Sequence, residues 1–121
     1  MTLRETVYNT LRGAVPVPGL YNETADPDAP TPYVVYRISR RPQDPWAIEQ
    51  ATVDIDVIDS STTAERAEEI ASDIEQALDS QHIGQYRFWL DGQIDIPVSE
   101  RYMWHRSMQF TARYTKDWRI Q

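Results

Sequence analysis

The sequence predicts an α+β fold: a mainly antiparallel sheet with one long helix packed on a face and a shorter N-terminal helix. Two strand patterns and one helical pattern support this prediction. Residues 33–40 are rich in apolar β-branched and aromatic side chains, and residues 51–59 alternate between aliphatic and polar ones. Both patterns are typical of strands. Residues 62–78 begin with a Ser/Thr cluster and continue with apolar residues at helical spacing. Because 121 residues suffice for one core, we expect a single domain, residues 1–121.

The N-terminal segment predicts a helix over residues 3–12. Thr2 and Glu5 form a capping-box pattern, in which two exposed helix amides are satisfied reciprocally. Apolar residues then recur at every fourth position, and Gly13 offers a left-handed stop.

Residues 14–32 are rich in proline and predict a surface loop with a short strand at residues 19–22. A connection of this length is typical of a functional loop or of one ordered by a neighbouring molecule.

The middle of the chain predicts two strands that form a hairpin. Residues 33–40 are rich in β-branched and aromatic side chains, which favours a central strand. Prolines at both ends of residues 42–45 indicate a turn, since proline cannot donate to a strand ladder. In residues 51–59 the odd positions from 53 to 57 are aliphatic, whereas Asp54 and Asp56 occupy even positions. One face of this hairpin is therefore expected to be buried and the other wet.

The second half of the chain predicts a helix and two more strands. Thr62 and Glu65 form a second capping-box pattern before an amphipathic helix that ends near Leu78. A short strand over residues 86–90 is followed by Asp-Gly, a strong turn signal. In the last strand, residues 102–114, the even positions carry the heavier side chains. Arg106 interrupts that heavier face, and we expect it to have a partner or to lie at a bulge.

Composition excludes several classes of protein. The chain contains no cysteine, so disulfides and thiolate metal sites are ruled out. No apolar run approaches the roughly 20 residues of a membrane helix, so we expect no membrane partner. The absence of a signal-peptide pattern favours synthesis in a cytoplasm. The net charge of −7 argues against binding through nucleic-acid phosphates.

We predict no catalytic residue, no cofactor and no metal. Asp54, Asp56 and Asp59 come closest to a metal site, but without the spacing of a cation-binding loop they indicate a solvated acidic strand face. His105 and Ser107 share a strand face, yet no nucleophile elbow surrounds them. The four glycines are too scattered for a phosphate-binding loop. An enzyme is therefore the least favoured class.

Arginine and aromatic residues instead indicate protein–protein contacts. The chain has eleven arginines and one lysine, which a GC-rich genome or arginine-rich subunit interfaces would each explain. We expect Trp89 and Trp104 in the core, whereas two other tryptophans are less easily buried within one subunit. The interface candidates are Tyr21, Arg40, Arg41, Trp46, Arg113 and Trp118.

The order of elements and several motifs resemble the tail terminator, or tail-completion, proteins of long-tailed phages and related gene-transfer particles. An acidic loop leads into the Pro-Tyr-Val segment at residues 32–36, and the alternating strand at residues 51–59 follows. A Ser/Thr-capped, Ala/Glu-rich helix comes next. The chain then closes with a strand that carries an arginine and aromatic residues, residues 104–110. The resemblance extends over nearly the whole chain.

This resemblance implies a structural virion protein at the head–tail junction. Such a protein forms a homohexameric ring that ends tail-tube polymerisation and docks to the head connector. The implied partners are further copies of the chain, the major tail tube protein and the head connector or stopper protein. DNA would pass through the lumen without sequence-specific binding, and Asp54 and Asp56 are candidate lumen residues. The segments 14–32 and 41–47 are the expected contacts with neighbouring molecules.

Two alternatives remain open from the sequence. The chain is also compatible with another neck, stopper or tail-tube component that has a similar small α+β fold. A different class of protein, a regulatory module that binds a small ligand, is the second alternative.

Overall fold

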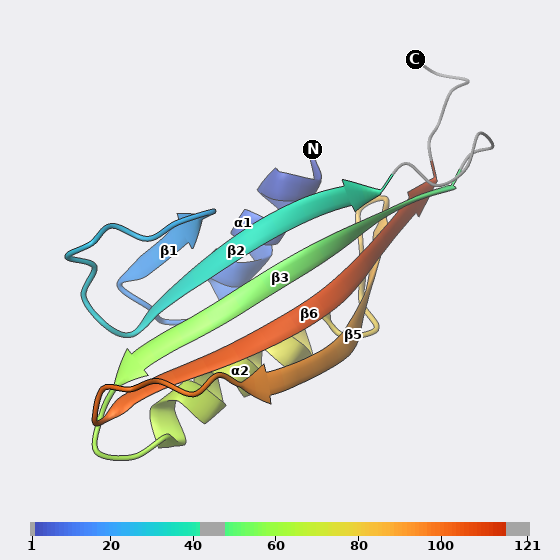
Figure 1. Cartoon of the computed structure of the whole chain (residues 1–121). Helices are drawn as coiled ribbons and strands as arrows, with labels where there is room; N and C mark the ends of the chain where they lie inside the picture. Colours follow the sequence, from blue (N-terminus) through green and yellow to red (C-terminus); the bar gives the residue numbers. More distant parts are fainter. Residues whose placement is uncertain (1, 42–47, 116–121) are drawn as a thin grey trace.

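A computed structural model of the chain describes residues 2–41 and 48–115 (Figure 1). The elements are, in order, α1 (Leu3–Ala14), β1 (Gly19–Asn22), β2 (Tyr33–Arg41), β3 (Ile48–Ser60), α2 (Glu65–Leu78), β4 (His82–Ile83), β5 (Tyr86–Asp95) and β6 (Met103–Thr115). The α+β class is thereby confirmed. The two helices have 12 and 14 residues, so the predicted contrast between a long and a short helix is not confirmed. No helix of the described part is long and apolar enough to cross a membrane.

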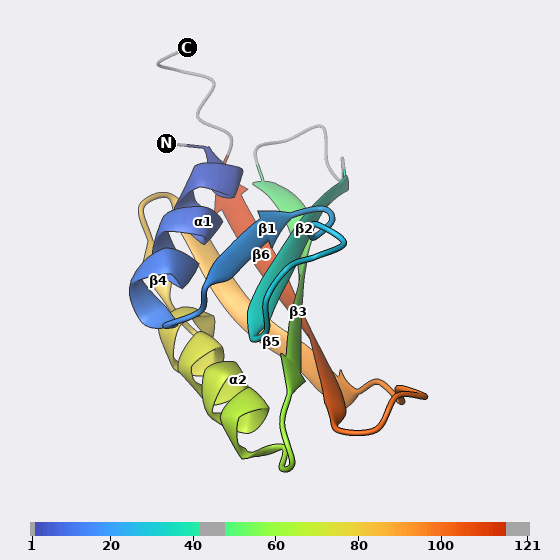
Figure 2. The ribbon, with the colours of Figure 1, turned by 90° about the vertical axis from the view of Figure 1, so that its left-hand side faces the viewer.

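The strands of the described residues form one six-stranded sheet in the order β1-β2-β3-β6-β5-β4. Only β1 and β2 pair in parallel, and the other four pairings are antiparallel. The β3–β6 pair lies at the centre, with a register that runs from Ile48↔Thr115 to Ser60↔Met103. Figures 1 and 2 show both helices on the same face of the sheet. The opposite face carries no helix.

The core lies between the sheet and the two helices, as the alternation in residues 51–59 predicts. The odd positions of β3 from 53 to 57 are fully buried, and so are even positions of β6 from 108 to 112. Each helix contributes one apolar stripe to this core. Its largest fully buried side chains are Leu3, Leu11, Ile55, Ile74, Leu78, Phe88, Met108 and Phe110.

The two helices begin differently. Thr2 Oγ1 accepts a hydrogen bond from the Glu5 amide at 3.1 Å, and the Glu5 carboxylate accepts from the Thr2 amide at 3.3 Å, which confirms the first capping box. The predicted box at Thr62 is wrong: α2 begins at Glu65, with Ala64 at the N-cap and no side-chain cap. Four residues separate β3 from α2, so Thr62 lies in the turn before the helix.

Both glycine-based stop signals differ from expectation. Gly13 lies inside α1, and the helix ends at Ala14, with Val15 as an extended C-cap residue. The Asp91-Gly92 pair forms a register shift within β5 instead of a turn, and the strand continues to Asp95. The reason is long-range pairing, since β6 hydrogen-bonds to β5 on both sides of the shift. The Thr111 hydroxyl also donates to the Asp91 carboxylate across this pair.

The edges of the sheet are short strands supplemented by side chains. β1 covers β2 only from Tyr33 to Tyr36. β4, which the sequence did not predict, covers only the first two residues of β5. Beyond β4, the Phe88 amide donates to the Gln81 carbonyl at 2.9 Å, and the Leu90 amide donates to Asp79 Oδ1 at 2.8 Å.

Candidate interaction surfaces

The helix-free face of the sheet is formed by the outward-pointing side chains of β2, β3, β5 and β6. The strand registers place Arg37, Asp54, Asp56, His105 and Arg113 on this face. It therefore brings together both lumen candidates and one interface candidate from the sequence. Because both helices cover the other face, this is the broad side of the sheet that is open to other molecules (Figure 2).

Asp56 is a buried acid at the centre of a polar network. Its side chain is only 10% exposed. Arg37 Nη1 donates to Asp56 Oδ2 at 2.9 Å, and a 3.0 Å hydrogen bond joins His105 Nε2 to Asp56 Oδ1. Arg37 Nε also donates to the Glu23 carbonyl at 3.1 Å. The network therefore joins β2, β3, β6 and the segment that follows β1.

The other two acids of β3 have different environments. Asp54 is half-buried, and its pKa is raised by burial and then by the neighbouring Asp56 charge, while Arg37 partly offsets this. Asp59 lies on the helix side of the sheet and is fully buried. Arg66 Nη2 and Nε donate to its two carboxylate oxygens at 2.6 and 3.0 Å.

The carboxylates of β3 consequently do not converge on one point. Asp59 is separated from Asp54 and Asp56 by the sheet itself. The expectation of a solvated acidic strand face is wrong for Asp56 and Asp59, because each is buried and paired with a cationic side chain. Asp59 occupies an odd-numbered position of the strand, as the buried aliphatic residues do, so strand alternation predicts its burial.

Trp89 also differs from expectation, since it lies on the helix-free face instead of in the core. The guanidinium carbons of Arg87 and Arg113 lie 5.7 and 5.6 Å from its ring centroid, within cation–π range. Phe88 and Leu90, the neighbours of Trp89 in β5, pack toward the core. By contrast, Trp104 packs against the core as predicted, with Nε1 donating to the Ser61 carbonyl at 3.0 Å.

The remaining interface candidates are spread over the chain. Tyr21 is half-buried and packs edge-on against Tyr33, with ring centroids 5.9 Å apart. Arg40 and Arg41 lie at the end of β2, beyond the residues that β1 covers. Two further candidates, Trp46 and Trp118, lie outside the described residues. The role of all these residues in contacts with other molecules stays a prediction.

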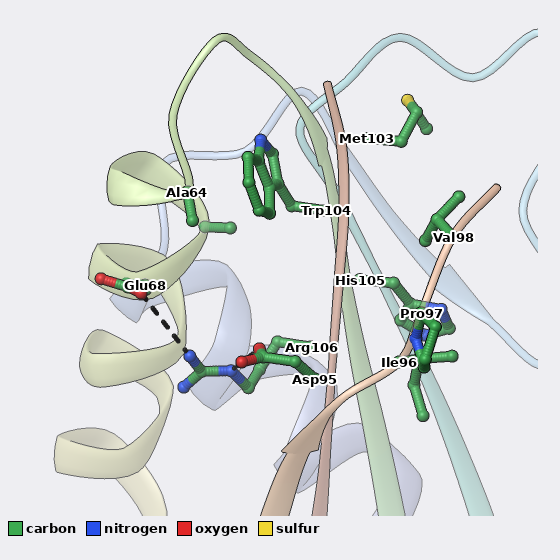
Figure 3. Close-up of a pocket in the computed structure, with 11 residues that line it drawn as sticks. Ala64, Glu68, Asp95, Ile96, Pro97, Val98, Met103, Trp104, His105 and Arg106 are labelled. Atoms are coloured by element: carbon green, nitrogen blue, oxygen red, sulfur yellow. Dashed lines mark hydrogen bonds and ion pairs between the residues drawn. The ribbon is translucent and has the colours of Figure 1, made fainter. Parts of the chain in front are cut away.

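A groove of about 380 Å³ lies at the other end of the sheet, between α2, the start of β6 and the segment after β5. Figure 3 shows Trp104 and Arg106 pointing from β6 toward α2, with the segment 96–98 running beside the strand. The Ile96 amide donates to the His105 carbonyl at 2.7 Å, which fixes this segment. The apolar lining, called the apolar groove below, consists of Ala64, Ala67, Ile96, Val98, Met103 and Trp104.

One end of the apolar groove is charged. Arg106 Nε contacts Asp95 Oδ1 at 2.6 Å, and Nη1 donates to Gln93 Oε1 at 2.9 Å. Its Nη2 lies 4.0 Å from Glu68 Oε1 (Figure 3). Arg106 thus has the partners that its position on the heavier face of β6 required. One signal for this groove in the sequence is the set of three aliphatic residues at alternate positions, Ile94, Ile96 and Val98.

These features define an α+β domain whose sheet has one helix-free face and an apolar groove at one end. A family model described as tail completion protein gp17 matches residues 6–115, from α1 to the end of β6. The chain therefore belongs to the tail completion protein gp17 family. This membership confirms the resemblance found in the sequence and supports a structural role in the tail of a phage particle.

A solved structure shares the fold. A chain of the virion of a native gene transfer agent particle aligns with a TM-score of 0.71 and 20% sequence identity. The alignment covers 93% of this chain and 94% of that one. No curated protein matches the sequence.

Proposed function

We propose that this chain forms a ring at the head-proximal end of the phage tail, where it ends tail-tube polymerisation and docks to the head connector. The observation that carries this proposal is the tail-completion match, which runs from α1 to the last strand. The partners are further copies of the chain, the major tail tube protein and the head connector or stopper protein. The whole chain, residues 1–121, acts as one domain in this ring.

The structure supports this proposal through its uncovered surfaces. One face of the sheet has no helix, and at the end of the sheet an apolar groove opens beside exposed aliphatic side chains (Figures 1 and 3). Repeated contacts between different patches of identical subunits generate a ring when the rotation closes. The net charge of −7 disfavours adhesion to DNA phosphates, so DNA would pass through such a ring without being held.

The experiment that tests this function is deletion of the gene from the phage that encodes the chain. We expect particles with tails of uncontrolled, excessive length and heads that are not joined to tails. Supplying the wild-type chain from a plasmid should restore tails of normal length. Deleted phage that still makes joined particles with tails of normal length would refute the proposal.

The ring itself is tested by the mass of the assembly in solution and on tails. Six copies of a 14.1 kDa chain make a particle of about 85 kDa. The alternative of another neck component would place the chain elsewhere in the particle, which cryo-electron microscopy of intact virions distinguishes. A ligand-binding module is less favoured, because the polar groups beside the depression at Asp56 already hydrogen-bond to one another.

A further inference from the structure

We propose that the apolar groove receives the C-terminal segment of a neighbouring copy of this chain, residues 116–121, with Trp118 as the anchoring side chain. This inference rests on the proposed ring and names the contact between its subunits. It is drawn from the lining of the groove, from the distance between the groove and the end of β6, and from the charges on both partners.

The groove has the character of a site for one large apolar side chain. Its volume of about 380 Å³ falls in the range of small-molecule and side-chain pockets. The exposed Val98 belongs to its lining, and the 63% exposed Ile94 lies four residues earlier in the chain. Residues 116–121 read Lys-Asp-Trp-Arg-Ile-Gln, so Trp118 and Ile120 are the apolar side chains available to fill it. Tryptophan is among the side chains that most often anchor protein contacts.

The segment of the same copy cannot reach the groove. The groove is lined by Met103 to Arg106 at the start of β6, whereas the described part of the chain ends at Thr115, at the far end of that strand. Figure 1 shows β6 running across the whole sheet. From Trp104 to Thr115 the strand covers about 35 Å. Trp118, three residues beyond, extends at most about 11 Å further in any direction. A second copy must therefore supply the segment.

Charge also favours this pairing. The exposed carboxylates of Glu68 and Asp95 border the groove, and Glu65 lies one turn before Glu68. Arg106 is the single described cation in the lining that faces them. The incoming segment carries Lys116 and Arg119 against the single acid Asp117, so its side chains bring a net positive charge to the acidic border.

This contact joins two different patches at opposite ends of the sheet. An interface of that kind is heterologous, and a joined pair of copies still has one free groove on one copy and one free segment on the other. Addition of further copies continues until the rotation closes into a ring. The ring that the proposed function requires therefore follows from a single repeated contact.

The first experiment measures the contact directly on the full chain. A fluorescent peptide of residues 115–121 is titrated with the Trp118→Ala chain, whose own segment cannot compete, and anisotropy is recorded. We expect saturable binding, and we expect Val98→Asp in the same chain to weaken it by about tenfold or more, because a carboxylate would be buried in an apolar site. Ile94→Asp is the matched control, since it places the same charge on an exposed aliphatic position outside the lining.

Two results would overturn the inference. One is the absence of saturable binding, and the other is equal affinity of the Val98→Asp and Ile94→Asp chains for the peptide. Both substituted positions are exposed, so matching thermal unfolding curves are expected and would show that folding is unaffected.

The second experiment uses mixing of variants. The Val98→Asp chain has an intact C-terminal segment but an altered groove, and the Trp118→Ala chain has an intact groove but lacks the anchoring side chain. Each variant alone therefore lacks one half of the contact. Their mixture should give dimers of about 28 kDa, twice the chain mass, by light scattering. If each variant alone still forms the same ring as the wild-type chain, the inference fails while the proposed ring stands. Failure of the proposed function is read separately, from tail length in the deleted phage.

Discussion

Replacing Asp56 with alanine tests whether the buried polar network stabilises the helix-free face. The substitution removes both acceptors, the 2.9 Å bond from Arg37 and the 3.0 Å bond to His105. A hydrogen bond to a charged group contributes about 1.5–3 kcal/mol when it is buried. Because the Arg37 side chain is 48% exposed, its pair with Asp56 is screened by solvent and is worth less, about 0.5 kcal/mol.

The sum of these two contributions is an expected loss of about 2 kcal/mol of unfolding free energy. For a chain of this size that corresponds to a fall in the melting temperature of roughly 8 °C. Urea unfolding followed by circular dichroism gives the free energy, and calorimetry gives the melting temperature. Both measurements should be made at neutral pH and low protein concentration, so that assembly does not contribute.

Asp54→Ala is the matched control for this prediction. It removes the same group from the same strand face two residues away, but burial and the Asp56 charge raise the pKa of Asp54, so its charge opposes folding. We expect Asp54→Ala to leave stability unchanged or to increase it at neutral pH. An Asp56→Ala chain as stable as the wild-type chain, or an equal loss of stability in both alanine variants, would show that the network does not stabilise this face.

Three further predictions follow from the described contacts. Asp54→Asn should stabilise the chain at neutral pH, where the ionised Asp54 carboxylate opposes folding. The gain should disappear as the pH falls through the raised folded-state pKa of Asp54 toward the ordinary aspartate range, because the protonated carboxyl group no longer opposes folding. Urea midpoints across pH measure this, and a gain that persists in acid would contradict it. Thr2→Ala removes the capping box of α1 and should cost about 1 kcal/mol of unfolding free energy, measured by urea unfolding. A variant as stable as the wild-type chain would contradict this prediction. Ile74→Ala leaves a cavity where α2 meets the sheet and should lower the free energy of unfolding by about 3 kcal/mol. Amide hydrogen exchange in α2 should become faster, and unchanged exchange there would show that α2 does not depend on this contact.

Strand alternation determines which side chains of this sheet are buried, and it does so more reliably than residue type. The aliphatic positions of residues 53–57 predicted the buried face of β3, and the structure confirms it. The same rule, applied to Asp59 and Trp89, would have placed Asp59 beside the core and Trp89 on the opposite face. Residue type led to the opposite assignments, because carboxylates are usually solvated and tryptophans usually buried. The position along the strand outweighs both tendencies here.

Other features depend on contacts between distant segments and could not be read locally. Asp91-Gly92 is a turn signal in isolation, but pairing with β6 carries β5 through it as a bulge. The network at Asp56 requires side chains from three strands, and the register that brings them together is a property of the whole sheet. The apolar groove needs α2, β6 and the segment 96–98 at once, so no single stretch of sequence describes it.

Two hydrogen bonds at the edge of β5 affect whether a strand of another copy can pair there. An unpaired strand edge is a template on which identical chains can stack without limit. In β5 the Leu90 amide is already bonded to the Asp79 carboxylate, and the Phe88 amide to the Gln81 carbonyl. A neighbouring strand would have to displace an anion and a carbonyl to add there. At these two positions the edge of β5 therefore offers no unpaired amide on which a strand of another copy could stack.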